Sequence, residues 1–319
     1  MNIVGIEKLY YGVQDMEASI RFYQDWGMEK VEAGANGADF RLRNHTFVHL
    51  RRASDASLPP FQVKWLPHLC HSTMREVIWG VDNAQTLQAI GAELSRDREV
   101  QEDASGTLHV RDEGGFAVGF AVTRQKALAM EPAAVNTVGT YGRQNRQAAA
   151  AKRRTVGPCR AGHIVFWMPG DRVKPVEFYV KRLGFRLTDE GPTMRFMRCK
   201  GSSDHHSLMF QGEGDYHGFQ HVAYEYQDHD DVMAVGSRME QQGWKTNTGP
   251  LRHNISSSFS WYIWNPAGGA AEAYSDIDCV NDEWVPHYHD PADPDFYRVS
   301  WTYVRPGKRR ARPGEWLED

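Results

Sequence analysis

An internal repeat is the feature that most constrains the fold of this 319-residue chain. Three short echoes occur in the same order in both halves, at an offset of about 150 residues: RFYQDWGM with EFYVKRLGF, EVIWGVD with HVAYEYQ, and EGGFAVGF with AGGAAEAY. Self-similarity at a fixed offset indicates that one structural unit is used twice. We therefore expect two similar units.

The pattern of apolar residues predicts the same order of elements in each unit. In the first unit we expect strands at 3–13, 39–42, 46–51, 75–80, 108–111 and 116–122, with helices capped by Asp15 and Asp82. In the second we expect strands at 162–168, 194–199, 207–211 and 220–226, and helices from Pro175 to Gly184 and up to Gly243. Each unit thus reads as β-α-β-β-β with an added helix. The predicted boundaries are 1–125, a linker over 126–158, a second domain over 159–276, and a tail over 277–319 that packs on the domains.

Composition excludes several classes of protein. The formal net charge is −4, which gives no general attraction for nucleic acid or anionic lipid. No apolar run approaches the roughly 20 residues that span a bilayer, and the first residues lack a signal-peptide pattern. The four cysteines (Cys70, Cys159, Cys199 and Cys279) are scattered without a CxxC pair. Free thiols of this kind fit a reducing compartment, so we expect a cytoplasmic protein.

The stretch from Leu251 to Tyr274 reads as a β-hairpin with its turn at Asn265–Gly269. If the hairpin is centred on Ala267, Tyr262 lies directly opposite Glu272, because both residues are five positions from the centre. The neighbours of Glu272 in its strand are small and apolar. A carboxylate there is costly to bury unless a cation meets it.

The repeat supplies an internal comparison for this carboxylate. His163, His221 and Glu272 stand at interior-looking strand positions of the second unit, where the first unit has Lys8, Glu76 and, roughly, Val118. The fold alone therefore does not require two histidines and a glutamate at these places. Two imidazoles and one carboxylate form the facial triad that suits Fe(II); Mn(II) fits the same donors, and Zn(II) is not excluded by ligand type.

The motifs of the second half resemble those of a known family. The pattern GHIVFW…FYVKRLGF…HHSLMF…FQHVAYE…RHNISSSFSWYIWNPAGGAAEAY is similar to that of the type I extradiol ring-cleaving dioxygenases of the vicinal oxygen chelate superfamily. The resemblance covers both units and is most specific from Gly162 onward. It implies an α+β fold of two tandem domains, each a pair of βαβββ modules that form a curved, partly open barrel. It also implies a metal site in the C-terminal domain only.

The resemblance carries functional residues over one by one. Its metal ligands fall on His163, His221 and Glu272, and a tyrosine ten residues before the glutamate falls on Tyr262. Its histidine on the oxygen side of the iron falls on His206 rather than on His205, and its histidine beside the substrate hydroxyls falls on His253. Residues 254–258 differ from the family's usual charged insert, which affects the surroundings of His253.

The activity implied by the resemblance is Fe(II)-dependent ring opening of a substituted catechol. Both atoms of O2 enter a small aromatic diol to give a hydroxymuconic semialdehyde-type product, with His206, His253 and Tyr262 handling protons. We expect no nucleic-acid or membrane partner, and we expect a homo-oligomer. The alternatives are another metal-dependent enzyme of the superfamily, such as a glyoxalase-like isomerase or an epimerase, and a non-catalytic binding protein. The former would not need the three proton-handling residues, and the latter would lack the triad.

Other histidine clusters are weaker candidates. His68, Cys70 and His71 lie in a proline-flanked loop without a fourth partner at a recognisable spacing, so we do not predict a second metal site there. His287 and His289 lie in the tail, and we expect surface or lid residues, with contact to the pocket left open.

Overall fold

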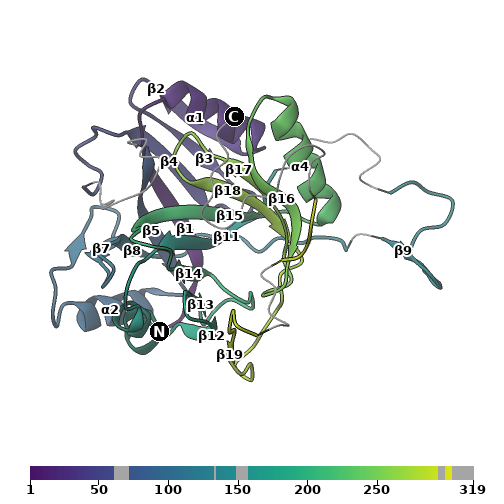
Figure 1. Ribbon diagram of the computed structural model, residues 1–319. Helices are drawn as coiled ribbons and strands as arrows, with labels where there is room; N and C mark the ends of the chain where they lie inside the picture. The colour runs from purple at the N-terminus through teal and green to yellow at the C-terminus, as the bar shows by residue number, and fades with distance from the viewer. Residues whose placement is uncertain (61–71, 133, 149–156, 294–298, 304–319) are drawn as a thin grey trace.

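The computed structural model describes residues 1–60, 72–132, 134–148, 157–293 and 299–303. Two large mixed β-sheets, one from each half of the chain, form its body, with the helices on their outer sides (Figure 1). His68, Cys70 and His71 lie outside the described residues, as do parts of the predicted linker and tail. In the described residues, no helix is long and apolar enough to cross a membrane.

The first sheet has eight strands in the order β2-β3-β4-β1-β5-β8-β7-β6. Its strands are β1 (Ile3–Val13), β2 (Glu29–Gly34), β3 (Gly37–Arg41), β4 (Phe47–Arg52), β5 (Thr73–Val81), β6 (Gln101–Glu102), β7 (Leu108–Arg111) and β8 (Ala117–Val122), and its helices are α1 (Met16–Asp25) and α2 (Ala84–Leu94). β1 and β5 pair antiparallel at the centre, and each pairs parallel with the last strand of its own module, β4 and β8. The sheet is therefore a pair of βαβββ modules.

The second sheet repeats this arrangement with ten strands in the order β19-β12-β13-β14-β11-β15-β18-β17-β16-β20. Its strands are β11 (Arg160–Trp167), β12 (Arg186–Glu190), β13 (Met194–Arg198), β14 (Leu208–Gln211), β15 (Gly218–Glu225), β16 (Thr246–His253), β17 (Phe259–Trp264), β18 (Ala270–Ser275), β19 (His287–Tyr288) and β20 (Val299–Thr302). Its helices are α3 (Val173–Glu177), the π-helix η2 (Phe178–Arg182) and α4 (His229–Gln241). The two outermost strands, β19 and β20, come from the tail. The predicted tandem fold of paired βαβββ modules is thus confirmed.

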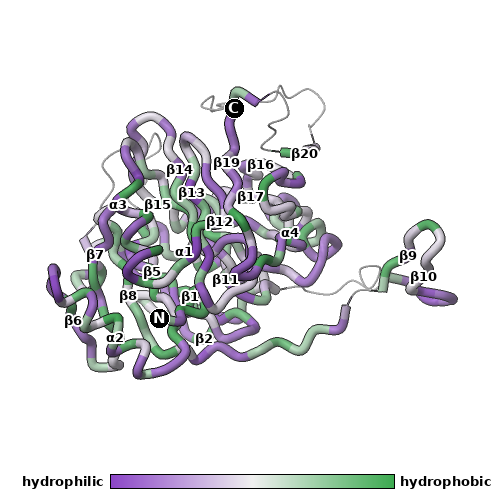
Figure 2. Tube along the Cα trace, turned by 90° about the horizontal axis from the view of Figure 1, so that it is seen from below, coloured by the Kyte–Doolittle hydropathy of each residue, from purple (hydrophilic) through white to green (hydrophobic). Residues whose placement is uncertain are grey.

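Several local expectations are corrected by the structure. β2 was not predicted because all six of its residues are exposed, so the strand carries no apolar alternation. Asn83, rather than Asp82, caps α2 and accepts a hydrogen bond from the Thr86 amide. The helix predicted from Pro175 is divided into α3 and the π-helix η2. The predicted linker contains a small hairpin of β9 (Asn136–Thr137) and β10 (Thr140–Tyr141), which projects from the body (Figure 2).

The two units share one hydrophobic core. β1 contacts β11, and the main cluster of buried apolar residues draws on both sheets. Reciprocal hydrogen bonds join the units at their hairpin turns. The Tyr179 hydroxyl of η2 donates to Asp112 Oδ2 of the first unit at 2.8 Å, and Asn265 Nδ2 of the second unit donates to the Tyr23 hydroxyl of α1 at 3.0 Å. A side chain of each unit therefore forms a hydrogen bond with a residue at a hairpin turn of the other unit.

Candidate metal centre

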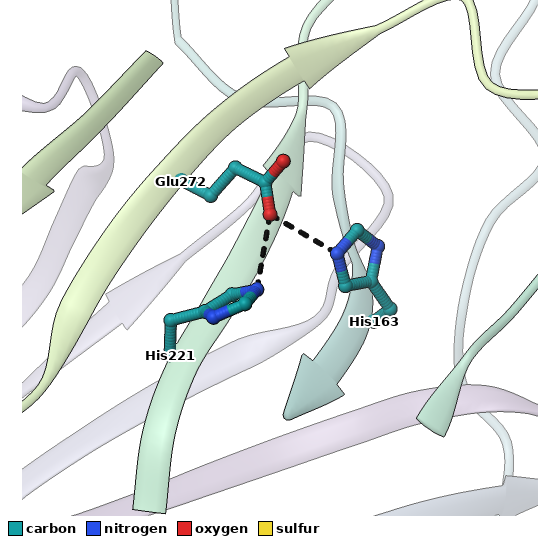
Figure 3. Close-up of side chains that lie close together, drawn as sticks. All are labelled: His163, His221 and Glu272. Carbon is teal, nitrogen blue, oxygen red and sulfur yellow. Dashed lines mark hydrogen bonds and ion pairs between the residues drawn. The ribbon is translucent and has the colours of Figure 1, made fainter. Parts of the chain in front are cut away.

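Three adjacent strands at the centre of the second sheet bring His163, His221 and Glu272 together (Figure 3). His163 of β11 pairs with Ala223 of β15, and Ala223 pairs with Glu272 of β18. His221 lies two residues before Ala223, so its side chain emerges on the same face. His163 and Glu272 are 109 positions apart in the sequence, yet all three side chains lie on one face of the sheet.

The donor atoms of this cluster converge on one point. His163 Nε2 and His221 Nε2 each lie 3.1 Å from Glu272 Oε2, and one ligand atom from each residue lies within 4.8 Å of the others. All three side chains are buried, and Glu272 is fully enclosed. Its second oxygen, Oε1, is buried without a hydrogen-bond partner in the described residues. A buried carboxylate with an unsatisfied oxygen and two imidazole nitrogens forms a donor set that fits a divalent cation.

Neighbouring groups orient the ligands. His221 Nδ1 lies 2.7 Å from Gln220 Oε1, and an amide oxygen only accepts, so that nitrogen carries the ring proton. His221 Nε2 is then bare and available to a metal, as is usual for a histidine ligand with an outer partner. A Cβ at Gly162 would lie 1.8 Å from the Tyr274 hydroxyl, so glycine is required where His163 enters the site.

Electrostatics favour an ionised Glu272 and a neutral His221. Burial alone would raise the pKa of Glu272, but His163 and His221 outweigh it and hold that pKa well below its usual range. Burial lowers the pKa of His221 although Glu272 opposes the shift. Both shifts favour the protonation states in which Glu272 and His221 can bind a metal.

The three predicted proton-handling residues surround this cluster. Tyr262 of β17 lies directly opposite Glu272, which confirms the register predicted for the hairpin. His253 Nε2 lies 2.8 Å from the Tyr262 hydroxyl and 3.9 Å from Glu272 Oε1. The His206 ring packs against His163 with centroids 4.1 Å apart, on the other side of the cluster from Tyr262 and His253 in the strand order.

Among the described residues, the corresponding face of the first sheet does not carry two histidines and a glutamate at the counterpart positions. Lys8 pairs with Ile78 and Ile78 pairs with Gly119, so Gly119, not Val118, is the counterpart of Glu272. A Cβ at Gly119 would lie 2.8 Å from the Leu108 carbonyl oxygen, which leaves no room for a glutamate. His109 lies opposite Gly119, at the position that corresponds to Tyr262. Its Nδ1 lies within hydrogen-bond distance of Glu76 Oε1, at 2.8 Å.

Sequence reasoning missed one group of residues near the site. Asp189 of β12, which was not singled out, is buried and in contact with His205, His287 and His289. The sequence signal was the pair His287 and His289 in the tail, whose contact with the pocket had been left open.

Comparisons with known proteins show what this chain is similar to. The family model described as Glyoxalase/Bleomycin resistance protein/Dioxygenase superfamily matches residues 160–268, the part of the chain that holds the whole cluster except Glu272. The chain is 27% identical over 197 residues to metapyrocatechase 2 of Cupriavidus necator, an alignment that spans 61% of this chain and 60% of the relative. The match thus leaves two fifths of that relative uncovered.

Two solved structures illustrate the fold. A Mn(II)-bound glyoxalase from Novosphingobium aromaticivorans matches with a TM-score of 0.69 at 22% identity, covering 98% of this chain and 99% of its own. The 2,3-dioxygenase LapB from Pseudomonas sp. KL28 matches with a TM-score of 0.70 at 14% identity, covering 91% of this chain and 98% of its own. At these identities the likeness concerns the fold, and it extends over both halves of the chain.

Proposed function

We infer that residues 160–268, which match its family model, form a domain of the Glyoxalase/Bleomycin resistance protein/Dioxygenase superfamily. On this premise we propose that this protein is an extradiol ring-cleaving dioxygenase. It would insert both atoms of O2 into a substituted catechol and release a hydroxymuconic semialdehyde-type product. The observation that carries the proposal is the set of proton-handling side chains beside the donor cluster. A metal site alone would serve many reactions, whereas His206, His253 and Tyr262 together suit a diol and an oxygen molecule that exchange protons.

The metal would be Fe(II), held by His163, His221 and Glu272; Mn(II) fits the same donors. Three protein ligands on one face leave the remaining positions for substrate and O2. When bound, the metal would act as a Lewis acid that lowers the pKa of the diol hydroxyls, and it would supply the redox chemistry for O2.

His253 is the residue best suited to accept a proton from the diol. Burial and the nearby Glu272 carboxylate raise the pKa of Tyr262 well above its usual range, so the phenol keeps its proton at neutral pH. Its hydroxyl, 2.8 Å from His253 Nε2, therefore acts as a donor that orients the imidazole or the substrate oxygen. His253 is partly exposed, and it can pass a proton onward to water.

His206 would serve the oxygen side. Burial, together with nearby His163 and His205, lowers the pKa of His206 well below its usual value, so the ring is neutral. A neutral imidazole can take up a proton in one step and return it in the next. In this position His206 would stabilise negative charge that develops on oxygen and donate the proton that accompanies O–O cleavage.

A separate apolar cluster of buried side chains lies beside the donor cluster. It consists of Val165, Met194, Phe196, Met209 and Ile255. Val165 shares the sheet face of His163, and the Phe196 ring lies 5.1 Å from the His206 ring. A wall of aliphatic, thioether and aromatic groups beside a polar centre is typical of a pocket that holds an apolar ligand by its polar end.

The decisive experiment is anaerobic loading with Fe(II), followed by measurement of O2 uptake with a panel of small catechols. We expect stoichiometric O2 uptake and a ring-opened product that absorbs in the near-visible region. Iron-loaded protein that consumes no O2 with any diol would reject the dioxygenase and leave the glyoxalase-like isomerase or epimerase, to be tested with the same loaded protein without O2. The cytoplasmic location and the homo-oligomer remain predictions, testable by fractionation and by sedimentation.

A further inference from the structure

The turn that connects β16 to β17, residues 254–258, has a strained backbone. Two consecutive residues in it, Ser256 and Ser257, lie in the left-handed region with φ of 72° and 55°. This region is rarely adopted by residues other than glycine, asparagine and aspartate. Such a conformation costs free energy and persists only where its surroundings hold it.

His253 depends on this turn because it is the last residue of β16. The ladder between β16 and β17 ends at the pair of Arg252 and Phe259, and on the β20 side the register breaks between Arg252 and His253. The His253 amide donates to the Ser258 carbonyl at the far end of the turn, at 2.9 Å. The His253 ring lies 2.8 Å from the Tyr262 hydroxyl through its Nε2. The conformation of the turn therefore contributes to the position of this ring.

One residue of the tail, Asp278, contacts both strained serines. Its amide donates to the Ser256 carbonyl at 2.9 Å, and its Oδ2 accepts a hydrogen bond from the Ser257 hydroxyl at 3.0 Å. The Arg252 guanidinium also donates to the Ser257 carbonyl. The bond between Ser257 and Asp278 joins two side chains, so substitution of either residue removes it.

The main chain of Asp278 is itself fixed by the loop that leads into β14. The Asp278 carbonyl accepts a hydrogen bond from the His205 amide at 2.8 Å, and the Val280 amide donates to the Ser203 carbonyl at 2.7 Å. This loop carries His206, on the other side of the donor cluster from His253 in the strand order. Asp278 thus joins the loop of His206 to the turn that follows His253.

We propose that Asp278 is a positioning residue that holds the turn at Ser256 and Ser257 and thereby fixes the place of His253 in the site. The inference rests on the proposed function in one respect, namely that His253 accepts a proton from the diol. Loss of the Asp278 side chain lets the turn relax and displaces His253 relative to the diol. The main chain of Asp278 keeps its bond to the loop of His206, so the oxygen side of the site is spared.

Amide hydrogen exchange of the metal-free protein tests the structural part of the inference. Asp278→Ala and Ser257→Ala each remove the same hydrogen bond, and either serves if the other does not fold. We expect both to speed exchange of the His253 amide by about 3- to 10-fold, the factor that corresponds to the net contribution of one hydrogen bond. The His205 amide should keep its wild-type rate. Asp278→Asn, which retains an acceptor oxygen, and Asp290→Ala, at an exposed tail residue, should match wild type at both amides.

Steady-state kinetics of the Fe(II)-loaded enzyme test whether Asp278 acts through His253. We expect Asp278→Ala to lower kcat/KM for the diol by about 10-fold, since a displacement of about 1 Å at a reacting group can cost about 100-fold. Iron content and KM for O2 should stay at their wild-type values. In a His253→Ala background, Asp278→Ala should cause no further loss, because the effects of residues that act as a unit do not add. A loss caused by destabilisation alone would appear in both backgrounds.

The outcomes separate this inference from the proposed function. An unchanged exchange rate of the His253 amide in both Asp278→Ala and Ser257→Ala would overturn the inference. So would a loss of kcat/KM in Asp278→Ala that is equally large with and without His253. The expected exchange rates in a protein that takes up no O2 with any diol would overturn the proposed function and leave the positioning of His253 by Asp278 standing.

Discussion

Tyr262 and Glu272 face one another across the antiparallel pair of β17 and β18, so one hairpin carries both a buried carboxylate and a phenol that stays protonated. The phenol hydroxyl is shared with His253, 2.8 Å away. One candidate metal donor and two of the predicted proton-handling groups therefore lie on three neighbouring strands. This arrangement lets the roles of metal binding and proton transfer be separated by single substitutions.

Tyr262→Phe should spare the metal and impair turnover. The variant removes only the hydroxyl, and the ring that packs against His221 is kept. We expect iron content equal to wild type and a fall in kcat/KM for the diol of about 10- to 100-fold, near the lower range of acid–base contributions. Tyr10→Phe, which removes a hydroxyl from the first sheet, is the matched control and should leave kcat/KM unchanged. Equal activity of the two variants would exclude the Tyr262 hydroxyl from the reaction.

Glu272→Gln should abolish metal binding with little change in fold. The substitution preserves shape but removes the charge that balances the cation between His163 and His221. Ligand binding at about 100 times Kd stabilises a protein by about 2.7 kcal/mol, so wild type should show a clear rise in Tm with Fe(II) or Mn(II). Glu272→Gln should show none, whereas Glu76→Gln, in the first unit, should behave like wild type. Retention of metal by Glu272→Gln would reject the assigned site.

His206→Phe should keep both the metal and the diol but slow the chemistry. A phenyl ring preserves the packing against His163 and Phe196 while it removes both ring nitrogens. Anaerobic titration should give a diol affinity close to that of wild type. The rate of O2 consumption should fall by about 10²-fold or more, as expected when a general acid–base group is lost. An unchanged rate would remove His206 from the mechanism.

Asp112→Asn should change how stability depends on pH. Burial raises the pKa of Asp112 to about 6, although hydrogen bonds from Tyr179 and two backbone amides oppose the shift. The folded state thus holds this proton more tightly than the unfolded chain, whose carboxyl has a pKa near 3.8. The stabilising contribution is complete below that value and is lost as pH rises through about 6.

Denaturant unfolding at several pH values would measure this effect. Relative to Asp112→Asn, the free energy of unfolding of wild type should decline by roughly 2–3 kcal/mol between pH 4 and pH 6.5 and then stay level. Asp290→Asn, at an exposed site, should run parallel to wild type. A difference between wild type and Asp112→Asn that is constant with pH would show that Asp112 has an ordinary pKa.

The repeat made much of the centre predictable from the sequence. His163, His221 and Glu272 stood out because their counterparts in the first unit differ, and the spacing around Ala267 placed Tyr262 opposite Glu272. The counterpart of Glu272 was misplaced by one residue, at Val118 instead of Gly119. A shift of one residue turns a side chain to the other face of a strand, and short echoes do not resolve it.

Local pattern by itself determined the repeated βαβββ modules, the hairpin register and the candidate donors, because alternation, caps and turns act over a few residues. Only the tertiary structure decided which distant groups meet. Asp189 lies about 100 residues from the tail histidines, and the parallel register of β19 against β12 joins them. Tyr179 reaches Asp112 across the two units in the same way. Such contacts depend on how whole sheets pack, and no spacing in the chain encodes them.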